Sequence, residues 1–293
     1  MSVLERDVVA LGAGAARCDV VPQAGGAIAG YWWEEGARRI DWLRPARAAD
    51  VARADAAAMA CLPIVPWAGS IRGGSFRFAD TEVDEGPDAR DGHGWRRSWR
   101  VVARGAAELK LEYCHEGGAW PWPYRARETI ALVDGVLRLT LVVINESDRL
   151  MPVGLGFCTA LPSASQAALV ATAQGPWRDS ADGAACGRQA SLSGADLARA
   201  AKDAGGGVFT GWDGRATVAW HNAGCELHLA ADWPLLSFLD VRRSNGLALA
   251  AMSQCGDACN LARAGVAGTG LRVLAPGASR SATIRLAPRR YPH

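Results

Sequence analysis

The segment RDGHGWRRSWR, residues 90–100, places one histidine between two glycines and beside arginine and tryptophan side chains. An imidazole binds or transfers protons near neutral pH, and Arg97 offers a fork of donors to oxygen ligands. Gly92 and Gly94 permit backbone conformations that other residues resist. Two hypotheses stay open for His93: it faces a ligand, or it is a hydrogen-bonded loop residue.

Twelve tryptophans are a second feature that could serve binding, because several lie in loop-like contexts. Trp67 lies in VPWAGS, Trp95 follows His93, and Trp120 and Trp122 lie in WPWPY. An indole face packs against the CH face of a sugar ring while nearby polar groups bind its hydroxyls. A carbohydrate cleft is one interpretation. The other is that most of these rings belong to the core of an all-β domain.

The eight cysteines are scattered through apolar segments without a CxxC pair. We expect reduced, mostly buried thiols. The best metal-binding candidate is Cys255 with Cys259, joined by Cys225 and His228. Two ligands without a second close pair do not have the spacing of a zinc site. The sequence therefore predicts no metal.

Alternating apolar residues predict strands along most of the chain. In residues 128–145, Asp134-Gly135 separates two alternating runs, the pattern of a β-hairpin. Residues 208–230 repeat this pattern and predict a three-stranded meander, and residues 271–288 predict two strands around Pro276-Gly277. Helical spacing is confined to residues 48–59 and 193–202.

Many short strands with little helix predict an all-β fold, a β-sandwich, in one domain over residues 1–293. The net charge of +2 and the lack of long like-charge runs argue against nucleic-acid and membrane partners. No apolar run reaches the roughly 20 residues of a membrane span, and the N-terminus lacks a signal-peptide pattern. We expect a cytoplasmic protein, monomeric or homodimeric.

Six segments in order resemble the aldose 1-epimerase, or galactose mutarotase-like, family. They are CLPIVPWAGSIRGGSFRF (61–78), HGWRRSW (93–99), WPWPYRARETIAL (120–132), VVINESDRLMPVGLGF (142–157), FTGWDGRATVAW (209–220) and LAPGAS (274–279). The resemblance implies a large antiparallel β-sandwich, the galactose mutarotase-like supersandwich, with few short helices. It also implies a small-molecule sugar as partner, a hexose or hexose phosphate, and no cofactor.

The family interconverts sugar anomers with a glutamate base and a histidine acid, while the HGxxR histidine, an arginine and an aspartate bind hydroxyls. His93, with Gly94 and Arg97, matches HGxxR. The family arginine falls on Ser70, so Arg72 becomes the candidate for the same hydroxyls. Trp67 and Trp95 complete the predicted sugar-binding set.

The acid and base positions of the family depart from its pattern. The acid histidine falls on Cys158, and the base glutamate falls on Ala250, which cannot move a proton. Asp257 is the candidate replacement base, and Asp203 is the acid nearest the family's sugar-binding aspartate. The predicted catalytic set is therefore His93, Cys158 and Asp257.

Three functions remain open on these residues. The first is an aldose 1-epimerase-like isomerase that opens a hexose ring by acid and base catalysis with degenerate catalytic residues. The second is a non-catalytic carbohydrate-binding or sensing protein. The third acts on a hexose phosphate gripped by Arg72, Arg96 and Arg97.

Overall fold

The hairpin predicted around Asp134-Gly135 forms in the computed structural model, which describes residues 8–162, 167–177, 206–232, 234–242 and 246–291. Strands β10 (Tyr124–Val133) and β11 (Val136–Asn145) pair over their whole lengths. Asp134 and Gly135 have φ values of 51° and 77°, the left-handed pair of a two-residue hairpin turn. The predicted helix 193–202, Asp203 and Cys186 lie outside the described residues.

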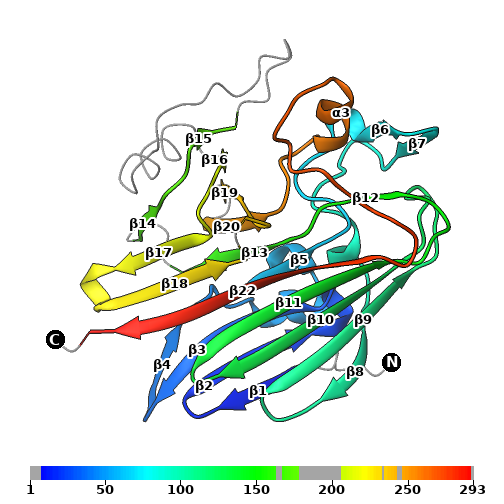
Figure 1. Ribbon diagram of the computed structural model, residues 1–293. Coiled ribbons are helices and arrows are strands. Elements are labelled where there is room, and N and C mark those ends of the chain that lie inside the picture. Colours follow the sequence, from blue (N-terminus) through cyan, green and yellow to red (C-terminus); the bar gives the residue numbers. More distant parts are fainter. Residues whose placement is uncertain (1–7, 163–166, 178–205, 233, 243–245, 292–293) are drawn as a thin grey trace.

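The strands form two large antiparallel sheets, which Figure 1 shows one over the other. The first sheet has ten strands. Its order is β1 (Val9–Ala13), β2 (Ala16–Val21), β3 (Ala27–Glu35), β5 (Cys61–Ile64), β13 (Gly156–Leu161), β20 (Leu247–Met252), β19 (Phe238–Arg242), β16 (Gly206–Thr210) and β15 (Gly175–Pro176), with β4 (Arg38–Asp41) paired to β3.

The second sheet has eight strands. Its order is β14 (Ala168–Ala171), β17 (Arg215–Trp220), β18 (Cys225–Ala231), β22 (Ser279–Arg290), β11, β10, β9 (Glu108–His115) and β8 (Arg100–Arg104). Two small ribbons, β6 (Ser75–Phe78) with β7 (Thr81–Asp84) and β12 (Met151–Val153) with β21 (Arg272–Leu274), complete the pairing. The predicted all-β sandwich is therefore confirmed.

Helix is scarce in the part of the chain that the structure describes. The α-helices there are α1 (Ala48–Arg53) and α3 (Ala258–Arg263). The helix predicted over 48–59 ends at Arg53, and a 3-10 turn over Ala56–Ala58 follows it. None of the described helices is long and apolar enough to cross a bilayer.

The predicted meander over residues 208–230 is wrong in one respect. β17 and β18 pair as expected, but β16 belongs to the other sheet, where it pairs with β19 and β15. Gly211 and Gly214, with φ values of 61° and 78°, turn the chain from one sheet to the other. The pattern located the strands, but alternation alone does not specify their partners.

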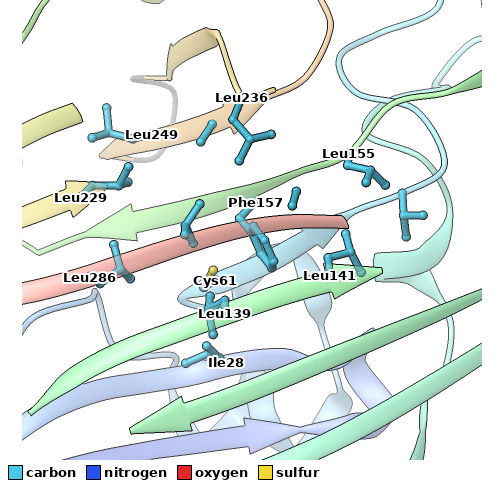
Figure 2. Packing of buried hydrophobic residues seen from close by; sticks show 14 of the residues in the cluster. Ile28, Cys61, Leu139, Leu141, Leu155, Phe157, Leu229, Leu236, Leu249 and Leu286 are labelled. Carbon is cyan, nitrogen blue, oxygen red and sulfur yellow. The ribbon is translucent and has the colours of Figure 1, made fainter. Parts of the chain in front are cut away.

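The core lies between the two sheets. Every second residue of β11 points inward, and Leu137, Leu139, Leu141 and Val143 are fully buried. They meet the inward side chains of the ten-stranded sheet, and Figure 2 shows Leu139 and Leu141 with Phe157 of β13 in this layer. The alternate residues of β13, β19 and β20 therefore face the opposite side of the ten-stranded sheet.

Candidate active site

Two neighbouring rows of side chains lie on the outer face of the ten-stranded sheet, across β13, β20 and β19. Cys158 of β13 lies opposite Ala250 of β20, and Ala250 lies opposite Asp240 of β19. The neighbouring row is Ala160, Ala248 and Arg242. Since cross-strand partners point to the same face, these six residues share one surface.

A cavity of about 210 Å³ opens over this surface, and we call it the sheet cleft. Leu62, Pro63 and Ile64 of β5, with Ala160 and Ala248, form its apolar floor. Its polar wall consists of Arg44, Arg90, Asp91, Cys158, Trp95 and Arg242. The volume lies below the roughly 300–1,000 Å³ of drug-sized ligand sites and suits one small ring.

The loop that carries Arg90 and Asp91 reaches the cleft because of glycines. A Cβ atom on Gly92 would lie 1.8 Å from the carbonyl oxygen of Val65, and Gly92 has φ of 71°. The Gly94 N–H donates to the same carbonyl at 3.1 Å. The Gly69 N–H donates to Oδ1 of Asp91 at 2.9 Å. The loop is thus fixed against the end of β5 with Asp91 at the cleft wall.

Arg242 lies at the centre of a buried ionic cluster. Its Nη1 is 2.7 Å from Oδ2 of Asp91, and its Nη2 donates to Oδ1 of Asp91 at 3.1 Å. Its Nε donates to Oδ2 of Asp240 at 2.6 Å. Burial lowers the pKa of Arg242, but the negative groups around it, which at neutral pH are the carboxylates of Asp91 and Asp240, outweigh burial and raise the pKa overall. The guanidinium therefore stays charged.

Cys158 is the predicted site residue that this cluster contacts directly. Arg242 Nη1 lies 3.5 Å from its Sγ. Burial raises the pKa of the Cys158 thiol, an effect that the Arg242 charge partly opposes. The thiol therefore carries its proton at neutral pH, and a guanidinium stands ready to stabilise the thiolate if that proton leaves.

His93 lies in a buried aromatic network instead of at the cleft wall, with 8% of its surface exposed. Its Nε2 is 3.1 Å from Nδ1 of His115 and 3.0 Å from the hydroxyl of Tyr124. His115 Nε2 is 2.7 Å from the carbonyl oxygen of Trp120, which can only accept, so Nε2 of His115 carries the proton. Nδ1 of the neutral His115 is then an acceptor.

The pKa values of both histidines are lowered. Burial, with smaller contributions from His115, Arg97 and Arg96, lowers the pKa of His93 to about 3. Burial also lowers the pKa of His115. Both imidazoles are therefore neutral at pH 7, and their hydrogen bonds tie the loop of Asp91 to strands β9 and β10.

Trp95 is the second predicted site residue at the cleft wall, where its Nε1 donates to the carbonyl of Arg90 at 3.3 Å. Trp67 is buried, stacked on Trp120 at 5.2 Å and edge-on to His93 at 5.7 Å. Arg97 is exposed and is not part of the cleft lining.

Asp257, Arg72 and Ser70 meet one another away from the sheet cleft. Oδ1 of Asp257 accepts from the Arg72 N–H at 3.1 Å and from Asn260 Nδ2 at 2.7 Å. The Asp257 N–H donates to the carbonyl of Ser70 at 2.6 Å. These hydrogen bonds join the loop of Ser70 and Arg72 to the start of α3. The structure therefore brings the three residues together but does not bring Asp257 to the cleft.

The sequence prediction missed Arg90, Asp91, Asp240 and Arg242. Asp91 stands two residues before His93 and has a left-handed φ of 58°, which is uncommon for a residue other than glycine. Asp240 and Arg242 alternate with buried apolar residues in FLDVR, a pattern that marks one face of β19. Within the described residues, no group of three or more His, Cys, Asp or Glu side chains could hold a metal ion.

The chain matches the family model described as Aldose 1-epimerase over residues 7–286. It is 30% identical to the uncharacterized protein YphB of Escherichia coli (strain K12) over 176 residues, which span 58% of this chain and 57% of that protein. The fold is similar to a candidate aldose 1-epimerase from Escherichia coli K12, with 21% identity, a TM-score of 0.77 and coverage of 97% and 99% of the two chains. A galactose mutarotase-like protein from Clostridium acetobutylicum gives 13% identity, a TM-score of 0.77 and coverage of 99% and 97%.

Proposed function

Because the chain belongs to the aldose 1-epimerase family, we propose that the sheet cleft binds one sugar ring and interconverts its α and β anomers. The reaction opens and recloses a hemiacetal, so it needs a base for the anomeric hydroxyl and an acid for the ring oxygen. Acid and base side chains suffice for these steps.

One observation carries the proposal: a thiol and a carboxylate meet the same guanidinium nitrogen at the cleft wall. Arg242 Nη1 is 2.7 Å from Oδ2 of Asp91 and 3.5 Å from Sγ of Cys158. The two atoms are therefore at most about 6 Å apart. Since both hemiacetal oxygens are bonded to one carbon, a base and an acid at this spacing can reach both of them.

In the proposed reaction the Asp91 carboxylate takes the proton of the anomeric hydroxyl while the Cys158 thiol protonates the ring oxygen. The C1–O5 bond breaks and the C1–O1 bond becomes a carbonyl. Rotation about C1–C2 presents the other face, and the same two protons return as the ring closes. Arg242 stabilises the thiolate formed in between.

Asp91 takes over the work of the family base in this proposal, since that base position is Ala250. His93 acts as a positioning residue, because its Nε2 is engaged with His115 and Tyr124 while its backbone continues the loop of Asp91. Trp95 offers an aromatic wall to the CH face of the sugar.

The test is exchange NMR between the anomers of hexoses, hexuronates and hexose phosphates, with and without protein. We expect acceleration in proportion to protein concentration, and a loss of about 10²–10⁴ in rate for Asp91→Asn and for Cys158→Ala. Asp213→Asn, in an exposed turn, is the matched control. The proposal fails if wild-type protein accelerates none of these sugars.

A second function, carbohydrate binding without catalysis, is favoured by one observation. Oδ1 of Asp91 already accepts hydrogen bonds from Gly69 and Arg242, and Oδ2 is ion-paired with Arg242. A carboxylate whose two oxygens are both engaged is less available as a base. Sugar binding in calorimetry without anomer exchange would establish this function in place of the first.

A further inference from the structure

The ionisable side chains on the sheet cleft are mostly cationic. Its lining contains the guanidinium groups of Arg44, Arg90 and Arg242 and the carboxylate of Asp91. Asp240, which lies opposite Ala250 in the row of Cys158, adds a second carboxylate next to this lining. The cleft wall thus carries more positive than negative groups, although the chain as a whole has a net charge of only +2.

Arg242 is occupied by protein groups. Its Nε and both Nη atoms make short contacts with Asp240 and Asp91, at 2.6 to 3.1 Å, and 18% of its side chain is exposed. A bidentate pair of this kind in a buried place holds its geometry tightly. Arg242 therefore organises the wall and has little donor capacity left for a ligand.

Arg90 differs from Arg242 in exposure and in the length of its contacts. Its side chain is 49% exposed, and its contacts with Oδ2 of Asp91 and Oδ2 of Asp240 are both 3.5 Å. Ion pairs of this length on an exposed side chain contribute little. The guanidinium can therefore turn toward a ligand without breaking a strong interaction.

The backbone of Arg90 is nevertheless fixed beside the proposed sugar-stacking residue. Its carbonyl accepts from Trp95 Nε1 at 3.3 Å, and Arg90 forms an isolated antiparallel bridge with Ser70. A ring that packs on Trp95 would present its substituents to the half-exposed guanidinium of a residue whose backbone is anchored. Guanidinium groups match the geometry of carboxylate and phosphate.

We propose that the ligand of the sheet cleft is an anionic sugar, whose carboxylate or phosphate group is bound by Arg90. This inference rests on the proposed function, because it names the substrate class of the same site. The sequence prediction assigned a phosphate grip to Arg72, Arg96 and Arg97, and those residues do not line the cleft. In the present proposal the anion is instead bound by Arg90, and Arg44 lines the same cavity.

The experiment compares neutral and charged sugars on the full chain. Calorimetry and anomer-exchange NMR would use D-glucose and D-galactose, their uronates, and D-glucose 6-phosphate. The variant is Arg90→Gln, which removes the charge and keeps much of the side chain. Arg138→Gln is the matched control, because Arg138 is exposed on β11 in the other sheet.

We expect at least one charged sugar to bind about tenfold or more tightly than its neutral parent, as charge-assisted bonds allow. Arg90→Gln should abolish this difference, and Arg138→Gln should retain it. A preference for the uronates over the phosphate, or the reverse, identifies the source of the anion.

The contrary outcomes are distinct. If neutral hexoses bind and exchange as well as charged ones, the anionic substrate is excluded while the isomerase function stands. If Arg90→Gln keeps the preference for charged sugars, Arg90 is not the residue that binds the anion, and the proposal is overturned at that point. If no sugar of either kind binds or exchanges, both proposals fall together. Circular dichroism and unfolding curves of Arg90→Gln would verify that the variant is folded.

Discussion

The Nε2 atom of His93 lies 3.1 Å from Nδ1 of His115, so two imidazoles from separate parts of the chain share one buried hydrogen-bonded network. Tyr124 and Tyr113 hydroxyls complete it at 3.0 Å and 3.3 Å. A second proton on either ring would remove an acceptor and place a charge among aromatic side chains. The network therefore requires neutral histidines.

The first prediction is acid destabilisation. The pKa of His93 falls from its ordinary 6.5 to about 3 in the folded chain. Above pH 6.5 His93 is neutral in both the folded and the unfolded chain. Between pH 6.5 and 3 the unfolded chain binds a proton that the folded chain does not, so the free energy of unfolding falls by about 1.4 kcal/mol for each pH unit. Urea unfolding between pH 7 and 4 measures the slope, and His93→Gln should reduce it. The exposed His221→Gln is the control, and equal slopes in both variants would contradict the assignment.

The second prediction concerns Glu128 of β10, a buried carboxyl whose Oε2 has no hydrogen-bond partner among the described residues. Burial raises its pKa well above the ordinary value. Below pH about 4.5 the Glu128 carboxyl is protonated in both the folded and the unfolded chain. Above that pH it ionises in the unfolded chain first, so the free energy of unfolding falls as pH rises. Glu128→Met should therefore raise the free energy of unfolding at pH 8 by about 1 kcal/mol or more. Denaturant titrations at pH 5 and 8 test it, and an unchanged pH dependence would count against it.

The third prediction concerns Glu112, whose carboxylate makes the protein less stable as pH falls, the reverse of the pH dependence expected from Glu128. Glu112 of β9 is ringed by Arg127, Arg100 and Arg125, at 2.9, 2.6 and 3.2 Å. The hydrogen bonds from Arg127, then Arg100 and Arg125, lower its pKa to about 2. Its contribution is present above pH 4.5 and is lost as pH falls toward 2. Glu112→Gln should destabilise the protein at pH 7 and flatten the acid side of the stability curve, whereas a variant as stable as wild type would show the cluster to be inert.

The fourth prediction separates backbone strain from steric clash. Gly14 and Gly92 both have positive φ, 56° and 71°. A Cβ on Gly14 would meet nothing within 4 Å, while one on Gly92 would lie 1.8 Å from the Val65 carbonyl oxygen. Gly14→Ala should cost about 1–2 kcal/mol. Gly92→Ala should cost clearly more and displace Asp91, so thermal unfolding and sugar binding would both change. Equal costs would argue against close contact at Val65.

The fifth prediction concerns the ionic cluster. Arg242→Met would leave the buried Asp91 and Asp240 with only the 3.5 Å contacts of Arg90, and we expect a loss of about 3–5 kcal/mol of stability. Adding Asp91→Asn and Asp240→Asn to that variant should recover much of the stability, since the uncompensated charges are then gone. Unfolding free energies of the single and triple variants make the comparison. A triple variant less stable than Arg242→Met alone would refute the electrostatic account.

The strands were predictable because alternation and turn residues are local. The β10–β11 hairpin follows from Asp134-Gly135 and the leucines around it. The partner of β16 did not follow, because pairing is set by packing between distant segments. His93 and Trp67 were located in the sequence as site residues, yet the sequence could not tell which way their rings turn.

The cleft was partly predictable for the same reason. Cys158 was identified from the family resemblance and Trp95 as a loop tryptophan, and both line the cleft. The loop held by Gly92 lies over β13 and β19, and this brings Arg90 and Asp91 to Arg242. The loop and β19 are far apart in the sequence. Such a junction leaves no spacing pattern for a single sequence to reveal.

The row Cys158, Ala250 and Asp240 has an evolutionary consequence. Neighbouring strands offer equivalent positions about 4.7–4.9 Å apart on one face. A reactive group lost from one strand can therefore be replaced from the adjacent strand, or from a loop above it, without any change in backbone path. In such a sheet the reactive group of a family can come from a different strand in different members while the fold stays the same. A comparison of aligned sequence positions would then find the usual catalytic residue missing and report an inactive site.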